Sequence, residues 1–222
     1  MRPGRLNDSV AWLFMVGSSC FALGTVPAYA TSVGGTAVGV TFFVGSLFFT
    51  SASLLQLVQT QSPEMGAGHG DAKGRLVWLA WLPHDRNWRA AATQFPGTLE
   101  FNISTLFALA MSLTAAQAHR TVWRPDFVGS VLFLAASTLA IIALGEGFLA
   151  WRPQSPPWWI AWVNMLGSVA FMASAIASLV IPGTSQAMNA AVASGGTFAG
   201  AVCFFVGAAL MLPAWRAAGR TA

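Results

Sequence analysis

Apolar residues along the chain gather into six long runs, separated by stretches that are richer in polar residues. A helix that crosses a bilayer needs about 20 predominantly apolar residues, and each of the six runs is long enough. The runs cover residues 10–30, 35–59, 99–118, 127–150, 159–181 and 190–214. The connections after the first, third and fifth runs are short, so we expect the helices they join to be antiparallel neighbours. The pattern predicts an all-α, polytopic membrane protein whose six transmembrane helices form three sequential antiparallel hairpins.

A short motif, Gly-Ser-x-x-Phe, recurs in these runs. Full copies begin at Gly17-Ser18, Gly45-Ser46, Gly129-Ser130 and Gly167-Ser168. Two weaker copies complete the set: residues 101–107 keep a serine and the phenylalanine, and residues 205–208 keep the glycine, Gly207. Because lipid gives little hydrophobic drive to bring helices together, small residues that allow close approach supply much of the packing. We therefore expect the motif residues to hold helices together; a ligand role for them is the alternative.

The runs divide the chain into three hairpins and one long connection. The first hairpin covers residues 1–60, the second 99–151 and the third 152–222, and together they form one integrated membrane domain. The first half of the connection 61–98 is rich in Gly and Pro, which predicts a loop. Its second half contains the apolar, Trp-rich segment 76–83, which is too short to cross a bilayer. This segment either lies along the membrane surface as a helix or packs as a loop on the helix ends.

Composition agrees with a membrane protein and argues against other classes. Of the 222 residues, 55% are hydrophobic and 8% are charged, whereas about a quarter of the residues in a soluble domain are charged. The net charge of +4 could suggest a nucleic-acid partner, but the basic residues are scattered singly and form no patch. We therefore expect a lipid bilayer as the main partner and no nucleic acid.

The distribution of Lys and Arg predicts the orientation, because these residues gather in cytoplasmic connections. With the N-terminus inside, only Arg120 and Arg124 fall on the outer side. The cytoplasmic side then holds Arg2, Arg5, Lys73, Arg75, Arg86, Arg89, Arg152, Arg216 and Arg220. Both termini are therefore predicted to be cytoplasmic (N-in/C-in), in a multi-pass protein of the inner (plasma) membrane.

Residues 1–30 also have features of a secretory signal peptide, since arginines precede an apolar run that ends at Ala28-Tyr29-Ala30. Two observations favour a retained helix instead. Asp8 interrupts the basic region, and residues 11–21 match residues 161–171 at a constant offset of 150. A segment that is removed has no need to share the packing pattern of a later helix.

The first hairpin carries Asn7-Asp8, then Phe14 through Ser18, and then Phe42 through Ser46. In these residues it resembles the YrhK-like domain family, small bacterial membrane hairpins whose helices each carry a Phe-x-x-Gly-Ser core. The third hairpin repeats the pattern without Asn-Asp and with Ala208 in place of the second serine. The family has no established biochemical activity, so the resemblance implies a class of bacterial membrane protein and no reaction.

Polar residues inside the runs are candidates for a functional site, because they cost free energy in lipid. All of them except Gln117 map to the cytoplasmic third of the predicted helices. Four of these could form one pocket that opens to the cytoplasm: Glu100, Asn102, Glu146 and Asn164. The two glutamates have simpler alternatives. Glu146 could reach the interface or pair with Arg152, and Glu100 could complement the dipole at the start of its helix.

Motifs for catalysis and for metal or cofactor binding are missing from the sequence. His69, His84 and His119 fall in predicted loops, so no helix offers axial ligands for a haem. The single lysine, Lys73, is also in a loop and cannot form a retinal Schiff base inside the bilayer. Cys20 and Cys203 show no metal-binding spacing. We therefore expect no metal, no cofactor and no enzymatic activity.

The sequence thus predicts a non-catalytic helical membrane module, either a scaffold or an accessory subunit of a membrane complex. Its protein partners would be further copies of the chain in a homo-oligomer, or the other subunits of a larger complex. The alternative is a small channel or transporter with a polar vestibule that faces the cytoplasm. The nearly apolar outer half of the predicted helices argues against the alternative, since transporters place polar groups near the midplane.

Overall fold

The computed structural model describes residues 2–62, 64, 74–109, 113–145, 151–180 and 187–221, with side chains to 216. This part of the chain is helical apart from its connections and one isolated β-bridge between Val180 and Ala187. The long helices are α1 (Pro3–Gly24), α3 (Gly35–Gln61), α4 (Arg86–Ala108), α6 (Arg124–Ala143), α7 (Pro156–Ala177) and α8 (Ala190–Thr221). Shorter helices are α2 (Pro27–Val33), α5 (Ala115–Ala118) and a π-helical turn, His119–Trp123, that joins α5 to α6.

Five helical segments of the described chain are long and apolar enough to cross a membrane. They are Pro3–Gly24, Gly35–Gln61, Ala115–Ala143, Pro156–Ala177 and Ala190–Arg216. These segments fit a multi-pass integral membrane protein. The remaining long helix, α4, spans 23 residues but is less apolar, because its first half holds Arg86, Asn87, Arg89 and Gln94.

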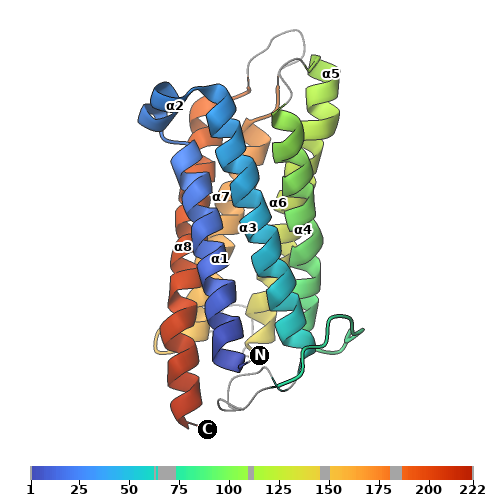
Figure 1. Cartoon of the computed structure of the whole chain (residues 1–222), viewed down its shortest axis with the longest axis vertical. Helices are drawn as coiled ribbons and strands as arrows, with labels where there is room; N and C mark the ends of the chain where they lie inside the picture. The colour runs from blue at the N-terminus through green and yellow to red at the C-terminus, as the bar shows by residue number, and fades with distance from the viewer. Residues whose placement is uncertain are drawn as a thin grey trace.

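The six long helices form a closed ring in which each packs against the next (Figure 1). The order around the ring is α1, α3, α4, α6, α7 and α8, and α8 packs back on α1. The hairpin pairs α1/α3, α4/α6 and α7/α8 make the most extensive contacts. Both chain termini lie at the same end of the bundle, which we call the terminal end, and α2 and α5 lie at the far end (Figure 1).

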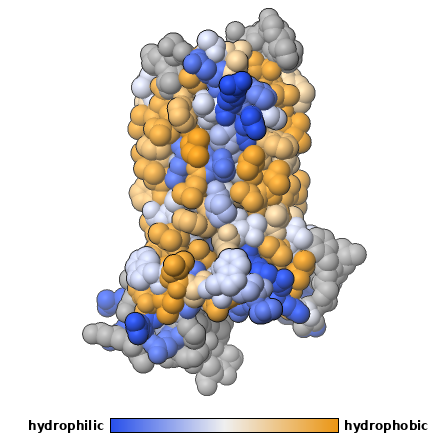
Figure 2. All heavy atoms as spheres, turned by 90° about the vertical axis from the view of Figure 1, so that its right-hand side faces the viewer, coloured by the Kyte–Doolittle hydropathy of each residue, from blue (hydrophilic) through white to orange (hydrophobic). Residues whose placement is uncertain are grey.

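The surface of the bundle is mainly hydrophobic along its middle (Figure 2). On the face that the figure shows, hydrophilic residues gather at the terminal end, and a hydrophilic strip extends from the far end into the hydrophobic region. Many large apolar side chains point outward from the helices, including Val44, Leu47, Leu106, Leu166 and Val202. A belt of outward apolar side chains is what contact with lipid requires.

The predicted third and fourth runs are displaced from the helices that the structure shows. The helix expected at 99–118 is α4, which begins at Arg86 and ends at Ala108. It begins early because Asp85 caps it: the Asp85 carboxylate accepts a 2.7 Å hydrogen bond from the Trp88 backbone N–H. The helix expected at 127–150 begins at Arg124, after a helical turn that contains His119. The placement of His119 in a loop was therefore wrong.

The apolar segment 76–83 is not helical. Its backbone is held at the end of α3, where Val77 N–H donates to Ser62 Oγ at 2.8 Å and Ala80 N–H donates to Gln61 Oε1 at 3.1 Å. Leu79 is 90% exposed and Trp81 is 80% exposed. The interpretation as a surface helix was therefore wrong, and the segment is an extended loop at the terminal end.

At the centre of each hairpin, a glycine on each helix packs against a phenylalanine on the other helix. A Cβ atom added to Gly17 would lie 2.6 Å from the Phe49 ring, and one added to Gly45 would lie 3.2 Å from the Phe21 ring. Gly97 and Gly129 show the same exchange with Phe133 and Phe101, at 2.9 and 3.1 Å, and Gly167 and Gly200 show it with Phe204 and Phe171. In each hairpin, the phenylalanine of one helix therefore covers the glycine of the other.

This geometry identifies the motif copies in α4 and α8. The weaker copies expected at 101–107 and 205–208 are replaced by Gly97-Thr98-x-x-Phe101 and Gly200-Ala201-x-x-Phe204. The residue after the glycine is buried in all six helices, and a threonine or an alanine serves there as well as a serine. Since the position requires only a small side chain, the Gly-Ser pattern is absent from two of the six copies.

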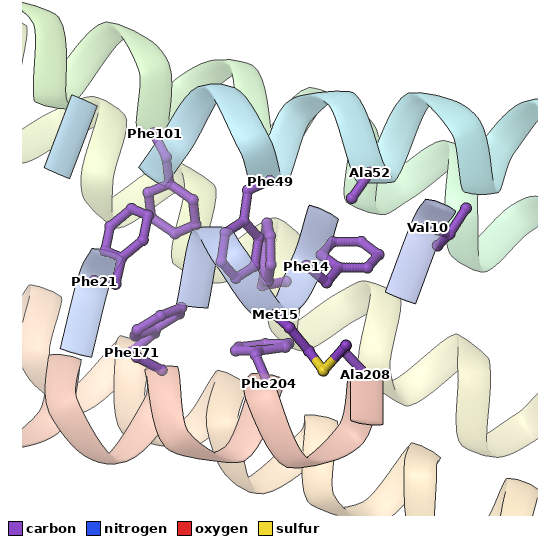
Figure 3. Packing of buried hydrophobic residues seen from close by; sticks show 12 residues of the cluster. Val10, Phe14, Met15, Phe21, Phe49, Ala52, Phe101, Phe171, Phe204 and Ala208 are labelled. Atoms are coloured by element: carbon purple, nitrogen blue, oxygen red, sulfur yellow. The ribbon is translucent and has the colours of Figure 1, made fainter. Parts of the chain in front are cut away.

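The six motif phenylalanines meet on the axis of the ring, and we call them the central phenylalanine cluster (Figure 3). They are Phe21, Phe49, Phe101, Phe133, Phe171 and Phe204. Phe49, Phe133 and Phe204 contact one another, with centroids 5.5–6.4 Å apart. Phe171 contacts both Phe21 and Phe101, at 6.1 and 5.9 Å. The cluster fills the middle of the bundle with tightly packed rings, mostly tilted or edge-to-face, which is the favourable arrangement for aromatic groups.

Candidate functional site

A cavity of about 570 Å³ lies inside the ring, between the central phenylalanine cluster and the terminal end. All six long helices contribute to its lining. Phe14 and Phe204, which belong to the hydrophobic core, line its inner part. Asp85, Asn87 and Pro157 lie at the starts of α4 and α7 and are exposed, so the cavity opens at the terminal end.

Neutral amide side chains give the cavity its polar character. Asn7, Gln56, Gln59, Gln94 and Asn164 all belong to the lining. The Gln94 side-chain amide donates to Gln56 Oε1 at 3.4 Å, and the Asn7 amide donates to the backbone oxygen of Met211 at 3.5 Å. Both distances are at the long limit for a hydrogen bond. These amides are therefore weakly engaged within the protein and can bond to a molecule in the cavity.

Asn164 of α7 packs against α8 at Gly207, where the glycine leaves room for the amide. A Cβ atom at Gly207 would collide with Asn164 Oδ1. This oxygen is buried and has no hydrogen-bond partner within the described part of the chain. Buried polar atoms are normally satisfied, and each exception in a native structure asks for an explanation. Gly207, which the sequence assigned to the packing motif, thus makes room for a polar side chain of the cavity.

Three equivalent helix positions differ in chemistry at the inner part of the cavity. Phe14, Gln94 and Asn164 each lie three residues before the motif glycine of their helix, in α1, α4 and α7. All three line the cavity. The helix packing around them repeats, but one position is aromatic and two carry amides. Packing alone therefore does not dictate these side chains, which makes them candidates for binding.

Of the four residues predicted to form one pocket, the three that the structure describes do not line one cavity. Asn164 lines the cavity, whereas Glu100 and Asn102 do not. Asn102 follows Phe101 of the central cluster, at the middle of the bundle, and its amide donates to Thr50 Oγ1 on α3 at 2.8 Å. The earlier start of α4 moves Glu100 and Asn102 away from the terminal end, so their placement in its third of the bundle was wrong. Glu146 lies outside the described residues.

Hydroxyl groups join neighbouring hairpins around the cavity and the central cluster. Ser137 Oγ of α6 and Ser168 Oγ of α7 lie 2.8 Å apart, and Ser46 Oγ of α3 lies 3.0 Å from Thr105 Oγ1 of α4. The other motif serines, Ser18 and Ser130, are buried. These two hydroxyl pairs therefore contribute to contacts between hairpins, whereas the motif glycines contribute to contacts within them.

The described residues contain no group of three or more His, Cys, Asp or Glu side chains that could hold a metal ion. Cys20 and Cys203 are free and half-buried within α1 and α8. The Cβ atom of Cys20 lies 2.7 Å from the position of a Cβ on Gly45. Cys20 therefore lies where α1 packs against α3.

The most informative cavity residue that the sequence interpretation missed is Gln94. It fell outside the predicted third run because the start of α4 was placed after it. A repeated pattern could have found this start: Trp81-x-Pro83 and Trp88 match Trp151-x-Pro153 and Trp158. The structure shows the same edge-to-face ring pair in both copies, with centroids 5.1 Å apart for Trp81 and Trp88 and 4.9 Å apart for Trp151 and Trp158.

Comparison of the chain with protein-family models, with curated proteins and with solved structures finds no significant match in any of the three. The resemblance of the first hairpin to the YrhK-like family stays a prediction from its motif.

Proposed function

We propose that this chain is a non-catalytic, six-span membrane protein that binds a small molecule in a cavity open to the cytoplasm. The observation that supports this function is the amide-lined cavity of about 570 Å³ between the helices. Binding sites for small molecules are concave, mostly apolar and lined by a few convergent polar groups. α4 would be the sixth span, because it packs between α3 and α6 in the ring.

The orientation within this proposal follows from the positive charges. Arg2, Arg75, Arg86, Arg89 and Arg216 belong to segments at the terminal end, and cytoplasmic ends carry the excess of Lys and Arg. The terminal end would then face the cytoplasm, and the cavity would receive its ligand from there. The central phenylalanine cluster would separate the cavity from the far end.

Thiol labelling at the cavity tests this function. In a Cys20→Ala/Cys203→Ala background, Ala140→Cys places a thiol on the cavity lining and Ile142→Cys places one on the outer face of the same helix. A water-soluble maleimide added to inside-out membrane vesicles should label Ala140→Cys quickly and Ile142→Cys slowly, because thiols in lipid do not ionise. Equal, slow labelling of both variants would show that the cavity is not open to water, and the proposal would fail.

A transporter is the second candidate, and one observation favours it. The cavity is open at one end and closed at the other by packed aromatic rings, which is the arrangement expected of one state in alternating access. A transporter must also expose the cavity from the far end. The Ala140→Cys thiol would then be labelled by maleimide added to intact spheroplasts, whereas a binding protein would be labelled only in inside-out vesicles.

A further inference from the structure

We propose that the cavity takes an uncharged, planar aromatic molecule that carries a hydrogen-bonding group such as a carboxamide. The proposal rests on the binding function above and names the class of ligand. Three properties of the lining lead to it: its charge, its aromatic wall and its amide wall.

Charge is confined to the rim of the cavity. Among the described lining residues the only ionisable side chain is Asp85. Its carboxylate is exposed and is engaged by the Trp88 backbone N–H at 2.7 Å. The deeper lining is neutral, and an ion placed there would lose its hydration without gaining a counter-charge. The cavity therefore favours an uncharged ligand.

One wall of the cavity is aromatic. Phe14 of α1 lines it together with Phe204 and Trp215 of α8, and α1 packs directly against α8. Aromatic side chains bind planar rings by offset stacking or edge-to-face contact. Phe14 and Phe204 come from two adjacent helices and line the inner part of this wall, whereas Trp215 lies about three helical turns further along α8, beside Gly4 at the opening. The inner pair therefore offers the surface that a planar ring can contact.

The opposite wall carries the amides. Gln56 of α3 and Gln94 of α4 face each other at 3.4 Å, and α4 lies across the ring from α8. Asn164 of α7 lies between these walls in the inner part of the cavity. An amide side chain has both donors and an acceptor, so this wall matches a ligand group that also has both. A ring stacked on the α1/α8 wall can present such a group to the amides.

Three naphthalene derivatives of similar size separate charge from shape: 2-naphthamide is neutral, 2-naphthoate is an anion and 2-naphthylmethylammonium is a cation. Each is added to purified Ala140→Cys protein, in the cysteine-free background, and the rate of maleimide labelling is measured. We expect 2-naphthamide to slow the labelling saturably, at concentrations about tenfold or more below those of the charged probes. Ile142→Cys controls for effects of the probes on the detergent micelle around the purified protein and on the maleimide itself.

Preference for a charged probe, or equal protection by all three, would overturn the proposed ligand class. Failure of all three to slow the labelling would also overturn it. In either case the proposed function would survive if Ala140→Cys is still labelled quickly in the absence of a probe. Slow labelling of Ala140→Cys without any probe would instead contradict the proposed binding function. Failure of the ligand class and failure of the function therefore give different results.

Two variants test the amides of the cavity. Gln94→Leu and Asn164→Leu should each weaken protection by 2-naphthamide about tenfold, since a buried hydrogen bond is lost. Asn102→Leu changes an amide of α4 outside the cavity and should leave protection unchanged. Unchanged protection in both cavity variants would contradict the proposal. If either variant fails to fold, the preference of the parent protein among the neutral, anionic and cationic probes still tests the proposed ligand class.

Discussion

Gly17 and Gly45 pack backbone to backbone at the centre of the first hairpin. The carbonyl oxygen of Gly45 lies 2.9 Å from the position of a Cβ on Gly17, and the carbonyl oxygen of Gly17 lies 3.1 Å from that of a Cβ on Gly45. Neither helix can carry a larger side chain here without moving the other. In a bilayer, where van der Waals packing drives much of helix association, such close approach stabilises the hairpin.

Substituting Gly17 by Ala should therefore destabilise the bundle. The added methyl group meets the Phe49 ring at 2.6 Å as well as backbone, and overpacking of this kind costs about 1–3 kcal/mol. Gly195→Ala is the matched control, because nothing lies within 4 Å of its Cβ position in α8. Unfolding by sodium dodecyl sulfate in mixed micelles measures both. Equal stability of the two variants would show that the glycine contact is not made.

Phe49 has the most ring contacts within the core, and its removal should be the costliest single change. It is 2% exposed and contacts the rings of Phe14, Phe21, Phe133 and Phe204. Phe→Ala changes in a core cost about 3–5 kcal/mol. Phe107→Ala, at a position that is 42% exposed on the outer face of α4, should cost far less in the same assay. A similar loss for both variants would count against a packed centre.

The Ser137–Ser168 hydrogen bond should couple α6 to α7. Single changes to Ala at either position remove the 2.8 Å contact, and the double change should cost less than the sum of the two. Coupling energies for such bonds in membranes average about 0.6 kcal/mol and reach about 1.7. Ser51, which is exposed and bonds to its own helix at Leu47, serves as the uncoupled partner. Additive costs for Ser137 and Ser168 would rule out the contact.

Gly207→Ala should disturb the cavity through Asn164. The new methyl group collides with Asn164 Oδ1, so the amide must move, and both stability and protection by 2-naphthamide should fall. Asn164→Ala removes the obstacle, so the double variant should recover stability but not protection. Stability that falls further in the double variant would mean that Gly207 serves another purpose.

The sequence predicted the helical membrane class and the positions of most long helices, because apolar runs of spanning length are a strong signal. It misplaced α4, since Arg86, Asn87 and Gln94 in its first half belong to a helix that is not uniformly apolar. Only the tertiary structure shows that α4 is enclosed by α3 and α6. A polar pocket that includes Asn164 was predicted, but the rest of its lining was not. Gln56, Gln94 and Asn164 come from three helices, and no sequence pattern fixes the order of helices in a ring.

The central claim is that the six helices close into one ring, so that the first and last helices pack together around the cavity. The Asn7 amide lies 3.5 Å from the backbone oxygen of Met211, which brings α1 and α8 within reach of a cross-link. In the cysteine-free background, mild oxidation of Asn7→Cys/Met211→Cys should form an intramolecular disulfide, counted by mass spectrometry as the loss of both maleimide-reactive thiols. Asn7→Cys/Ile142→Cys, on helices that lie across the ring, should keep both thiols. If the α1/α8 pair keeps both thiols as well, the ring is open and the enclosed cavity does not exist.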